Sequence, residues 1–208
     1  GPIAGRDIYE AFQLGASNIL VPMIESEFAV KQCAETFTQL KPAFTGLKFI
    51  PKLLINIETK IAFKNIKEIV NVIYLENLPI NTFVIGRSDL SESYGISNVN
   101  SEKILEISKK VLKSIENKDI DATIGGNLKA DSFNFFDSLY SNKLTKFESR
   151  KCTFKATERL SKHEFIDLLN KGLEFELSWL KYKEKLYLNR SKEEILRINI
   201  INERLNKK

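Results

Sequence analysis

The sequence predicts an α/β protein built on a parallel sheet, because strand-like and helix-like segments alternate along most of it. Apolar runs such as "NILVPMI", "LLINI" and "TFVIG" are continuous, as in strands that are buried on both faces. The segments between them have apolar residues at helical spacing, so a sheet wrapped by helices is expected. A doubly wound sheet and a (βα)8 barrel both fit this alternation. No G-x-G-x-x-G motif follows the first strand, which disfavours the dinucleotide-binding form.

Five strands and five helices are expected before the alternation ends. The expected strands are residues 17–26, 48–58, 81–90, 120–128 and 146–157. The expected helices are residues 6–16, 27–40, 59–75, 99–118 and 130–144, and the first should stop at Gly15, a residue suited to a helix C-terminus. Five strands cannot close a (βα)8 barrel. Either the first strands are truncated, or another chain supplies them, or this register is wrong.

From about Thr157 the sequence predicts helix alone. Residues 1–156 are therefore expected to form the barrel portion, and residues 157–208 a helical extension. Two helices are expected in it, separated near Leu188–Ser191, because Ser191 and Glu194 have the spacing of a capping box. The extension has an apolar stripe that either packs on the barrel portion or forms a partner surface with Trp179 and Tyr182 as anchors. The stripe consists of Phe165, Leu168, Leu169, Leu173, Phe175, Leu177 and Trp179.

Composition places the chain among ordinary globular proteins. It has 208 residues, of which 43% are hydrophobic and 28% are charged. No apolar run approaches the roughly 20 residues of a membrane span, so no membrane partner is expected. Cys33 and Cys152 are too few for a disulfide framework or a zinc site, which makes a reducing cytoplasm the expected location. The net charge is +5, but lysines alternate with acids along residues 101–119, so nucleic acid is not expected as a partner.

The expected strand ends carry the residues that suggest chemistry. In order they are Glu25, Glu58, Asp89, the segment 125–127 and the segment 148–150. Carboxylates that meet at one mouth repel one another unless protonation or a cation neutralises them. Oxygen ligands without a nearby His or Cys suit Mg²⁺ or Mn²⁺ rather than zinc. The single histidine, His163, lies in the helical extension and is expected at its surface.

Three motifs together resemble the HpcH/HpaI aldolase and citrate lyase family. They are "LGASNILVPMIES", "INIETKIAFKNIKEIV" and "FVIGRSDLSESYG", which match the family's PM-x-E/Q, I-E-T and G-x-x-D-L-S pattern in the right order. The resemblance covers roughly residues 7–95 and is looser beyond them. It implies a (βα)8 TIM-type barrel, here lacking its first strands, with divalent-metal-dependent carbon–carbon lyase activity.

The resemblance also implies roles for individual residues. Glu58 and Asp89 would be the metal ligands. Arg87 and Glu25 would be catalytic, although Arg87 could instead pair with a neighbouring acid and Glu25 could cap the following helix. Substrate contacts would come from Asn56, Gly86 and Ser88, with Asn56 on the same side of its strand as Glu58 by period two. The family aldolases have Gln at the Asn56 position, and the proton-shuttling His of related aldolases has no match here.

The expected function is therefore that of a metal-dependent lyase or aldolase. It would act on a small 2-oxo acid of the pyruvate or oxaloacetate type, through an enolate stabilised by Mg²⁺ or Mn²⁺. A CoA-thioester lyase of the citrate lyase branch is one alternative. A non-catalytic or incomplete barrel relative that serves assembly is another. The family's habit of forming oligomers implies a homo-oligomer.

Overall fold

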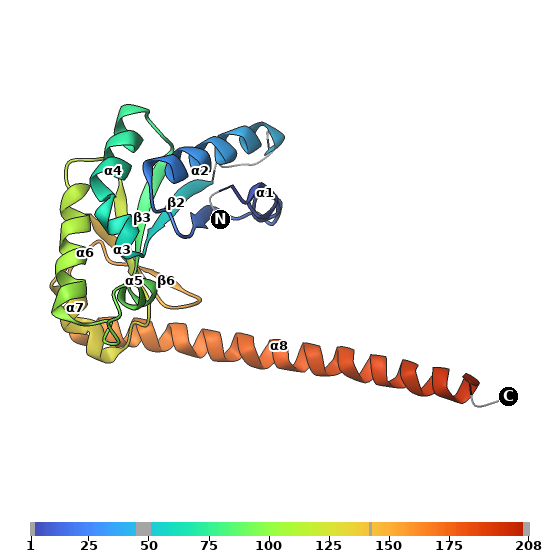
Figure 1. The fold of residues 1–208 in the computed structure, drawn as a ribbon. Helices are drawn as coiled ribbons and strands as arrows, with labels where there is room; N and C mark the ends of the chain where they lie inside the picture. Colours follow the sequence, from blue (N-terminus) through green and yellow to red (C-terminus); the bar gives the residue numbers. More distant parts are fainter. Residues whose placement is uncertain (1–2, 45–50, 142, 206–208) are drawn as a thin grey trace. The chain divides into compact units, whose positions relative to one another are not determined.

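The computed structural model describes residues 3–44, 51–141 and 143–205, and the chain divides into two compact units, Gly1–Leu169 and Asn170–Lys208. The first unit contains the sheet (Figure 1). Its six strands are adjacent in chain order, and the sheet curls into part of a barrel. The strands are β1 (Asn18–Val21), β2 (Lys52–Ile57), β3 (Ile80–Gly86), β4 (Asp121–Gly125), β5 (Leu144–Glu148) and β6 (Thr153–Lys155).

Strands β1 to β5 are parallel, as predicted, whereas β6 pairs with β5 in the antiparallel direction. The single strand expected at residues 146–157 is wrong, because a turn at Ser149–Cys152 divides it into a hairpin. The amide of Ser149 donates to the carbonyl of Cys152 at 2.8 Å, and the amide of Cys152 donates to Oγ of Ser149 at 3.1 Å. Serine side chains that bond the nearby backbone favour such turns.

Helices connect the strands of the first unit, and the last helix begins there and continues into the second unit. They are α1 (Gly5–Gln13), α2 (Glu27–Leu40), α3 (Lys60–Lys64), α4 (Ile66–Leu75), α5 (Arg87–Ser93), α6 (Glu102–Ser114), α7 (Phe133–Asp137) and α8 (Lys162–Leu205), with short 3-10 turns at Lys41–Phe44 and Ala130–Ser132. The chain reverses after α1 at Gly15, whose φ of 79° suits glycine. Helices α2 and α4 are in contact, as are α4 and α6.

Most predicted elements are shorter in the structure than expected; the helix expected at 130–144, for example, is reduced to a 3-10 turn and α7. Two of the differences bear on the site. The helix expected at 59–75 is divided at Asn65 into α3 and α4. The strand expected at 81–90 ends at Gly86, and the chain turns directly into α5. Asp89 consequently lies in the first turn of a helix rather than on a strand.

The two faces of the sheet differ in chemistry. Ile55, Phe83 and Ile124 face the helices and belong to the apolar core. On the opposite, concave face, Asn56, Val84 and Thr123 are register partners across β2, β3 and β4. Side chains alternate between faces along a strand, so the next concave layer lies at the carboxyl ends of these strands. The concave face therefore carries polar residues beside the apolar Val84, and its next layer lies at the mouth of the partial barrel.

Helix α8 begins with a capping box, but not at the predicted place. The side chain of Ser161 and the carboxylate of Glu164 bond each other's backbone amides at 3.3 and 2.8 Å. The break expected at Leu188–Ser191 is wrong, because the helix continues through it to Leu205. That segment contains no Gly or Pro, so nothing in its backbone chemistry stops the helix.

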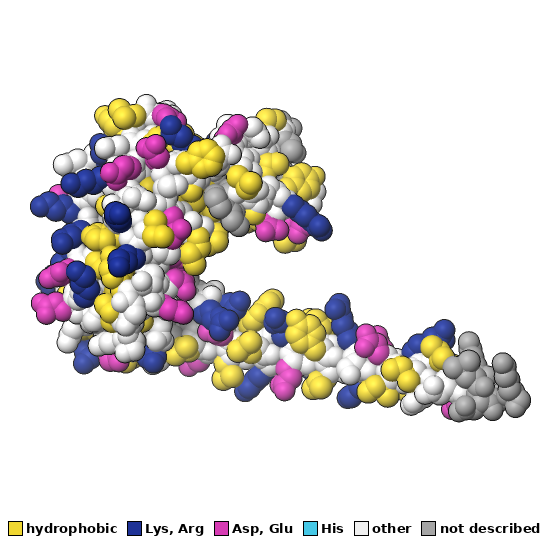
Figure 2. Space-filling model, viewed as in Figure 1, with side chains coloured by type: hydrophobic (Ala, Val, Ile, Leu, Met, Phe, Trp, Pro, Cys, Tyr) yellow, Lys and Arg dark blue, Asp and Glu magenta, His cyan; other side chains and the backbone are white. Residues whose placement is uncertain are grey.

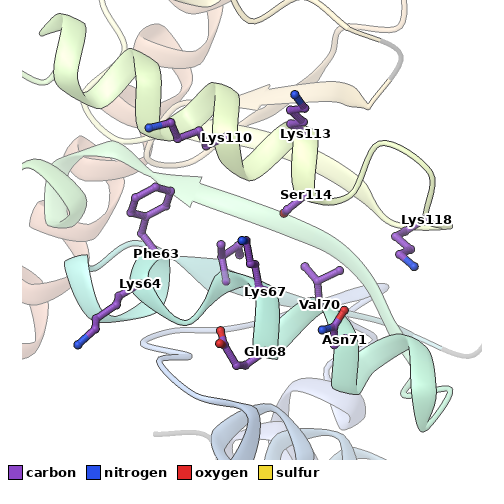
Figure 3. Close-up of a pocket in the computed structure, with 11 residues that line it drawn as sticks. Phe63, Lys64, Lys67, Glu68, Val70, Asn71, Lys110, Lys113, Ser114 and Lys118 are labelled. Atoms are coloured by element: carbon purple, nitrogen blue, oxygen red, sulfur yellow. The ribbon is translucent and has the colours of Figure 1, made fainter.

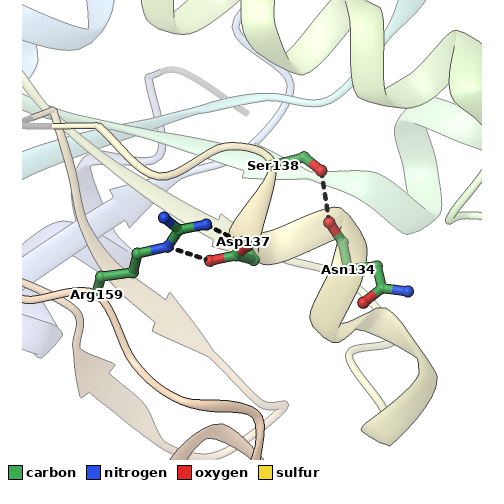
Figure 4. Close-up of polar contacts among 4 residues, drawn as sticks. All are labelled: Asn134, Asp137, Ser138 and Arg159. Atoms are coloured by element: carbon green, nitrogen blue, oxygen red, sulfur yellow. Dashed lines mark hydrogen bonds and ion pairs between the residues drawn. The ribbon is translucent and has the colours of Figure 1, made fainter.

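Two contacts join the start of α8 to the rest of its unit. Phe165 is fully buried, and its ring lies 4.8 Å from that of Phe136 and 5.0 Å from that of Phe147. Just before the helix, the Arg159 guanidinium forms a two-pronged contact with Asp137 of α7 at 2.7 and 2.6 Å (Figure 4). The aromatic cluster is buried and the ion pair is exposed, so the cluster contributes more to stability.

The second unit consists of the remainder of α8. Leu173, Phe175, Leu177 and Trp179 keep between 43% and 55% of their surface exposed, whereas Phe165 and Leu169 in the first unit are buried. Apolar side chains are visible along the surface of this helix (Figure 2). His163, at the helix start, is 86% exposed, as predicted, and lies 3.0 Å from Asp167. No helix in the described ranges is both long and apolar enough to cross a membrane.

Replacing Phe165 by Ala should lower the free energy of unfolding by about 3–5 kcal/mol, because the substitution leaves a cavity among three aromatic rings. Urea denaturation measures the change. Phe175→Ala, on the same helix but 52% exposed, is the matched control and should cost much less. Equal losses in the two variants would contradict the packing described for Phe165.

Candidate functional site

The carboxyl ends of four parallel strands form one layer at the mouth of the curled sheet. Glu58 follows the last residue of β2, Gly86 ends β3, Gly125 ends β4 and Glu148 ends β5. Gly86 and Gly125 are register partners. The two glycines thus lie between the two glutamates. In parallel α/β folds this edge is where ligands bind and chemistry takes place.

Glu58 is the most buried acidic residue of this layer, with 3% of its surface exposed. One of its carboxylate oxygens accepts the backbone amide of Met23 at 3.0 Å, and the Asn56 side chain also donates to it. Met23 has a left-handed backbone, with φ of 57°, which is uncommon for a residue other than glycine. This strained conformation at the end of β1 aims an N–H group at Glu58.

Burial raises the pKa of Glu58 above its usual range, and the hydrogen bond from Met23 opposes this change. The Asp89 carboxyl raises it further, through its charge and its hydrogen bonding. Asp89 is exposed in the first turn of α5, so the turn that follows Gly86 brings its carboxyl to that of Glu58. The two residues predicted to share a cation are therefore neighbours.

Gly86 makes room for this arrangement. A Cβ atom at position 86 would lie 2.7 Å from an oxygen of Glu58 and 3.0 Å from its Cβ, closer than such atoms approach one another. The role that the structure gives Gly86 is to leave space for Glu58. Its predicted contact with substrate stays a prediction.

Glu148 is the site residue to which the sequence prediction gave no role. A Cβ atom at Gly125 would lie 2.6 Å from a carboxylate oxygen of Glu148, so Glu148 leans over the end of β4. Burial raises the pKa of Glu148, and the charge of Glu58 raises it further. One indication in the sequence pointed to Glu148 as part of the site, namely its place in "KFESR" among the expected strand ends. That segment lies outside the three motifs that resemble the family.

Arg87 is fully buried and holds the loop beyond β4. Its Nε donates to the carbonyl of Gly125 at 3.1 Å, and one Nη donates to the carbonyl of Gly126 at 2.7 Å. The other Nη donates to Oδ1 of Asn100 at 2.6 Å, and the guanidinium lies 4.7 Å from the ring centre of Phe135. Burial lowers the pKa of Arg87 to about 10. These contacts fix the Gly125–Gly126 turn, and pairing of Arg87 with a substrate carboxylate stays a prediction.

The other predicted site residues have different surroundings. Oε1 of Glu25 accepts the hydroxyl of Thr59 at 2.6 Å, so Glu25 braces the residue that follows Glu58. Ser26, not Glu25, caps the following helix. The amide of Ser88 lies close under Gly126, where a Cβ atom would be 2.5 Å from it. Catalytic and substrate-binding roles for Glu25 and Ser88 stay predictions.

The donor set suits a hard divalent cation. Glu58 and Asp89 supply carboxylate oxygens, and Oδ1 of Asn56, beside Glu58, is buried without a hydrogen-bond partner in the structure. Mg²⁺ and Mn²⁺ accept such oxygens and complete their shells with water. Within the described ranges, no group of three His, Cys, Asp or Glu side chains is arranged to hold an ion. An ion at this site would therefore have two carboxylate ligands and rely on the amide, water or substrate for the rest.

A separate groove lies outside this mouth, between α4 and α6 (Figure 3). Its volume is about 790 Å³, and its lining combines apolar side chains such as Phe63 and Ile66 with five lysines. The lysines are Lys64, Lys67, Lys110, Lys113 and Lys118. None of the acidic site residues contributes to the groove.

The fold and the site together define the class of this protein. It is a (βα) protein whose parallel strands form part of a barrel, and two acidic residues lie close together at the carboxyl ends of these strands. Comparison with known families then places the chain: the HpcH/HpaI aldolase/citrate lyase profile matches residues 2–143. The chain belongs to this family. No curated protein matches it.

Solved structures share the fold at low sequence identity. An HpcH/HpaI aldolase/citrate lyase family protein from Burkholderia cenocepacia J2315 is 13% identical, with a TM-score of 0.53, and the match covers 67% of this chain and 61% of that one. The HpcH/HpaI aldolase from Desulfitobacterium hafniense DCB-2 is 14% identical, with a TM-score of 0.51, over 64% and 58% of the two chains. The citrate synthase SbnG is 15% identical, with a TM-score of 0.55, over 88% and 71%. The chain thus spans about three fifths of the first two relatives.

Replacing Gly86 by Ala should displace Glu58 and lower the free energy of unfolding by about 1–3 kcal/mol, because the added methyl group meets a carboxylate oxygen and a Cβ atom. Thermal unfolding measures the effect. Gly5→Ala is the control, since its nearest neighbour would be a methyl carbon at 3.6 Å. The account of Gly86 fails if both variants unfold at the wild-type temperature.

The raised pKa of Glu58 predicts a pH dependence of stability in the absence of metal. The folded state holds a proton on Glu58 at pH values where the unfolded chain has lost it, so this residue destabilises the fold as pH rises through the raised pKa. With EDTA present, Glu58→Gln should therefore lose less stability than wild type between about pH 5 and about pH 8. Urea denaturation at several pH values measures the difference, with the exposed Glu116→Gln as control. Parallel profiles for wild type and Glu58→Gln would contradict a raised pKa of Glu58 in the folded protein.

Proposed function

We propose that this chain carries the divalent-cation site of a carbon–carbon lyase or aldolase that acts on a small 2-oxo acid. The observation that carries the proposal is the convergence of Glu58 and Asp89 at the mouth of a partial parallel barrel in a chain of this family. Two neighbouring carboxylates, one of them buried, favour a cation between them. Mg²⁺ and Mn²⁺ fit their oxygen atoms and that of Asn56.

The architecture around this site is part of the proposal. The five parallel strands would belong to a barrel of the (βα)8 type. Residues 1–156 would form the barrel portion, and residues 157–208 a helical extension that serves packing or homo-oligomer formation. The exposed apolar side chains on α8 support a role of the extension in packing or homo-oligomer formation. The protein would act in the cytoplasm, without nucleic acid or membrane as a partner.

The chain's own residues would prepare the site for a 2-oxo acid. A bound divalent ion supplies Lewis acidity toward the negative charge that develops on the keto oxygen during carbon–carbon cleavage. Glu58 and Asp89 retain the ion, and the Met23 amide and Asn56 side chain keep Glu58 in place. Glu25 holds Thr59, and Arg87 holds the Gly125–Gly126 turn, so both sides of the mouth are braced. Such preorganisation preserves catalytic geometry.

Isothermal titration with Mn²⁺ and Mg²⁺ tests the site directly. Wild type should bind one ion, and Glu58→Gln or Asp89→Asn should weaken binding about a hundredfold, because each removes a carboxylate charge at the ion. Glu116→Gln is the matched control, and the protein should release pyruvate from 4-hydroxy-2-oxopentanoate only without EDTA. Ion binding that survives both substitutions, or no binding by wild type, would favour the non-catalytic relative that serves assembly.

A further inference from the structure

Two carboxylates lie side by side over the two central glycines of the strand-end layer. Glu58 extends over Gly86, and Glu148 extends over Gly125, each within 2.7 Å of where a Cβ atom would be. Because Gly86 and Gly125 are register partners on neighbouring strands, the two carboxylates lie over adjacent positions of the layer. The charges of both Asp89 and Glu148 thus lie near Glu58.

Among the residues that the structure describes, Glu148 has no basic partner in an ion pair. No ion pair between described residues includes it, and the charge of Glu58 acts on it directly. The nearest charged residues on its own strand and hairpin partner are Lys146 and Lys155, and these two pair with each other in the register one layer below. Across the hairpin, the register partner of Glu148 is Thr153, so no opposite charge lies beside Glu148 on this strand pair.

The charges at the mouth limit what can bind beside the ion. When all three acids are ionised, as expected at pH values above the raised pKa of Glu148, three carboxylates and one divalent cation leave one negative charge on the carboxylate that does not hold the ion. A substrate carboxylate that reached this side of the mouth would be repelled at short range, in surroundings of low dielectric. A hydroxyl group at the same place could instead donate a hydrogen bond to Glu148, and bonds to charged acceptors are the stronger ones.

We propose that Glu148 is a specificity-determining residue that selects 2-oxo acids whose far end is uncharged or hydroxylated and rejects those that carry a second carboxylate. This inference rests on the proposed function, since it assumes that Glu58 and Asp89 hold the ion that binds the 2-oxo acid. In this selection the protein would differ from an enzyme adapted to dicarboxylic substrates. The role follows from Gly125 as much as from Glu148, because any side chain at Gly125 would displace the carboxylate.

Binding of two matched probes tests the selection without turnover. 2-Oxopentanoate and 2-oxoglutarate have chains of equal length and differ in a terminal methyl or carboxylate group. In the presence of Mg²⁺ at pH 8, calorimetry should give the wild type at least a tenfold preference for 2-oxopentanoate. Glu148→Gln should reduce this preference about tenfold, and Glu148→Asp, which keeps the charge, should retain it. Glu116→Gln is the control for removal of a distant charge.

Cleavage provides a second readout with atoms balanced. In 4-hydroxy-2-oxopentanoate the C3–C4 bond breaks, the C4 hydroxyl loses its proton to become the aldehyde of acetaldehyde, and C3 gains a proton to give pyruvate. The same step in 4-hydroxy-2-oxoglutarate gives pyruvate and glyoxylate. Wild type should have a higher kcat/KM for 4-hydroxy-2-oxopentanoate than for 4-hydroxy-2-oxoglutarate. Glu148→Gln should bring these two kcat/KM values closer together. Added salt should also bring the two wild-type kcat/KM values closer together, because it screens the charge of Glu148. This measurement does not depend on whether a variant folds.

The outcomes separate the two proposals. If the wild type binds neither ion nor probe, the proposed function fails and this inference falls with it. If the wild type binds ion and probes but shows no preference between them, only the role of Glu148 is overturned. The role of Glu148 is also overturned if a folded Glu148→Gln variant keeps the wild-type preference for 2-oxopentanoate and salt does not change the preference of the wild type.

Discussion

The structure depends on one electrostatic constraint: the carboxyl groups of Glu58 and Asp89 meet at the mouth of the sheet, where like charges repel. Burial of Glu58 makes the constraint more severe, since its pKa is raised by burial before Asp89 adds to the effect. The surrounding chain is arranged to tolerate it. Gly86 leaves space for the side chain, and Met23 donates its amide from a left-handed backbone. Residues in such conformations cluster at functional sites, where the rest of the fold holds them.

Support for this site comes from side chains that hold the backbone around it in place. Glu25 holds the hydroxyl of Thr59, which also caps α3, so the residues after Glu58 are fixed on both sides. Arg87 turns its guanidinium toward the carbonyls of Gly125 and Gly126. The same turn carries Gly126 close to the amides of Arg87 and Ser88, which fixes the start of α5 and with it Asp89. A single connected set of contacts therefore positions both acids.

Local patterns in the sequence predicted much of the sheet and part of this site. The limits of α2 match the expected helix at 27–40, because Ser26 caps it and its apolar spacing is regular. Period two placed Asn56 beside Glu58, as the structure has it. The sequence analysis missed three features: the antiparallel β6, the early end of β3 at Gly86 and the unbroken α8. Each depends on turn chemistry or on competition between neighbouring segments. The position of Glu148 depends on strand register and on the absence of a side chain at Gly125, which no local pattern reveals.

A crystal structure of the protein grown with MnCl2 would test the central claim most directly. The account predicts anomalous density for one ion between the carboxylates of Glu58 and Asp89, with ion–oxygen distances of roughly 2.0–2.3 Å. Density at that position in wild type and its loss in Glu58→Gln would support the claim. A wild-type crystal without an ion there, in which each of the two acids is instead paired with a basic side chain, would contradict it.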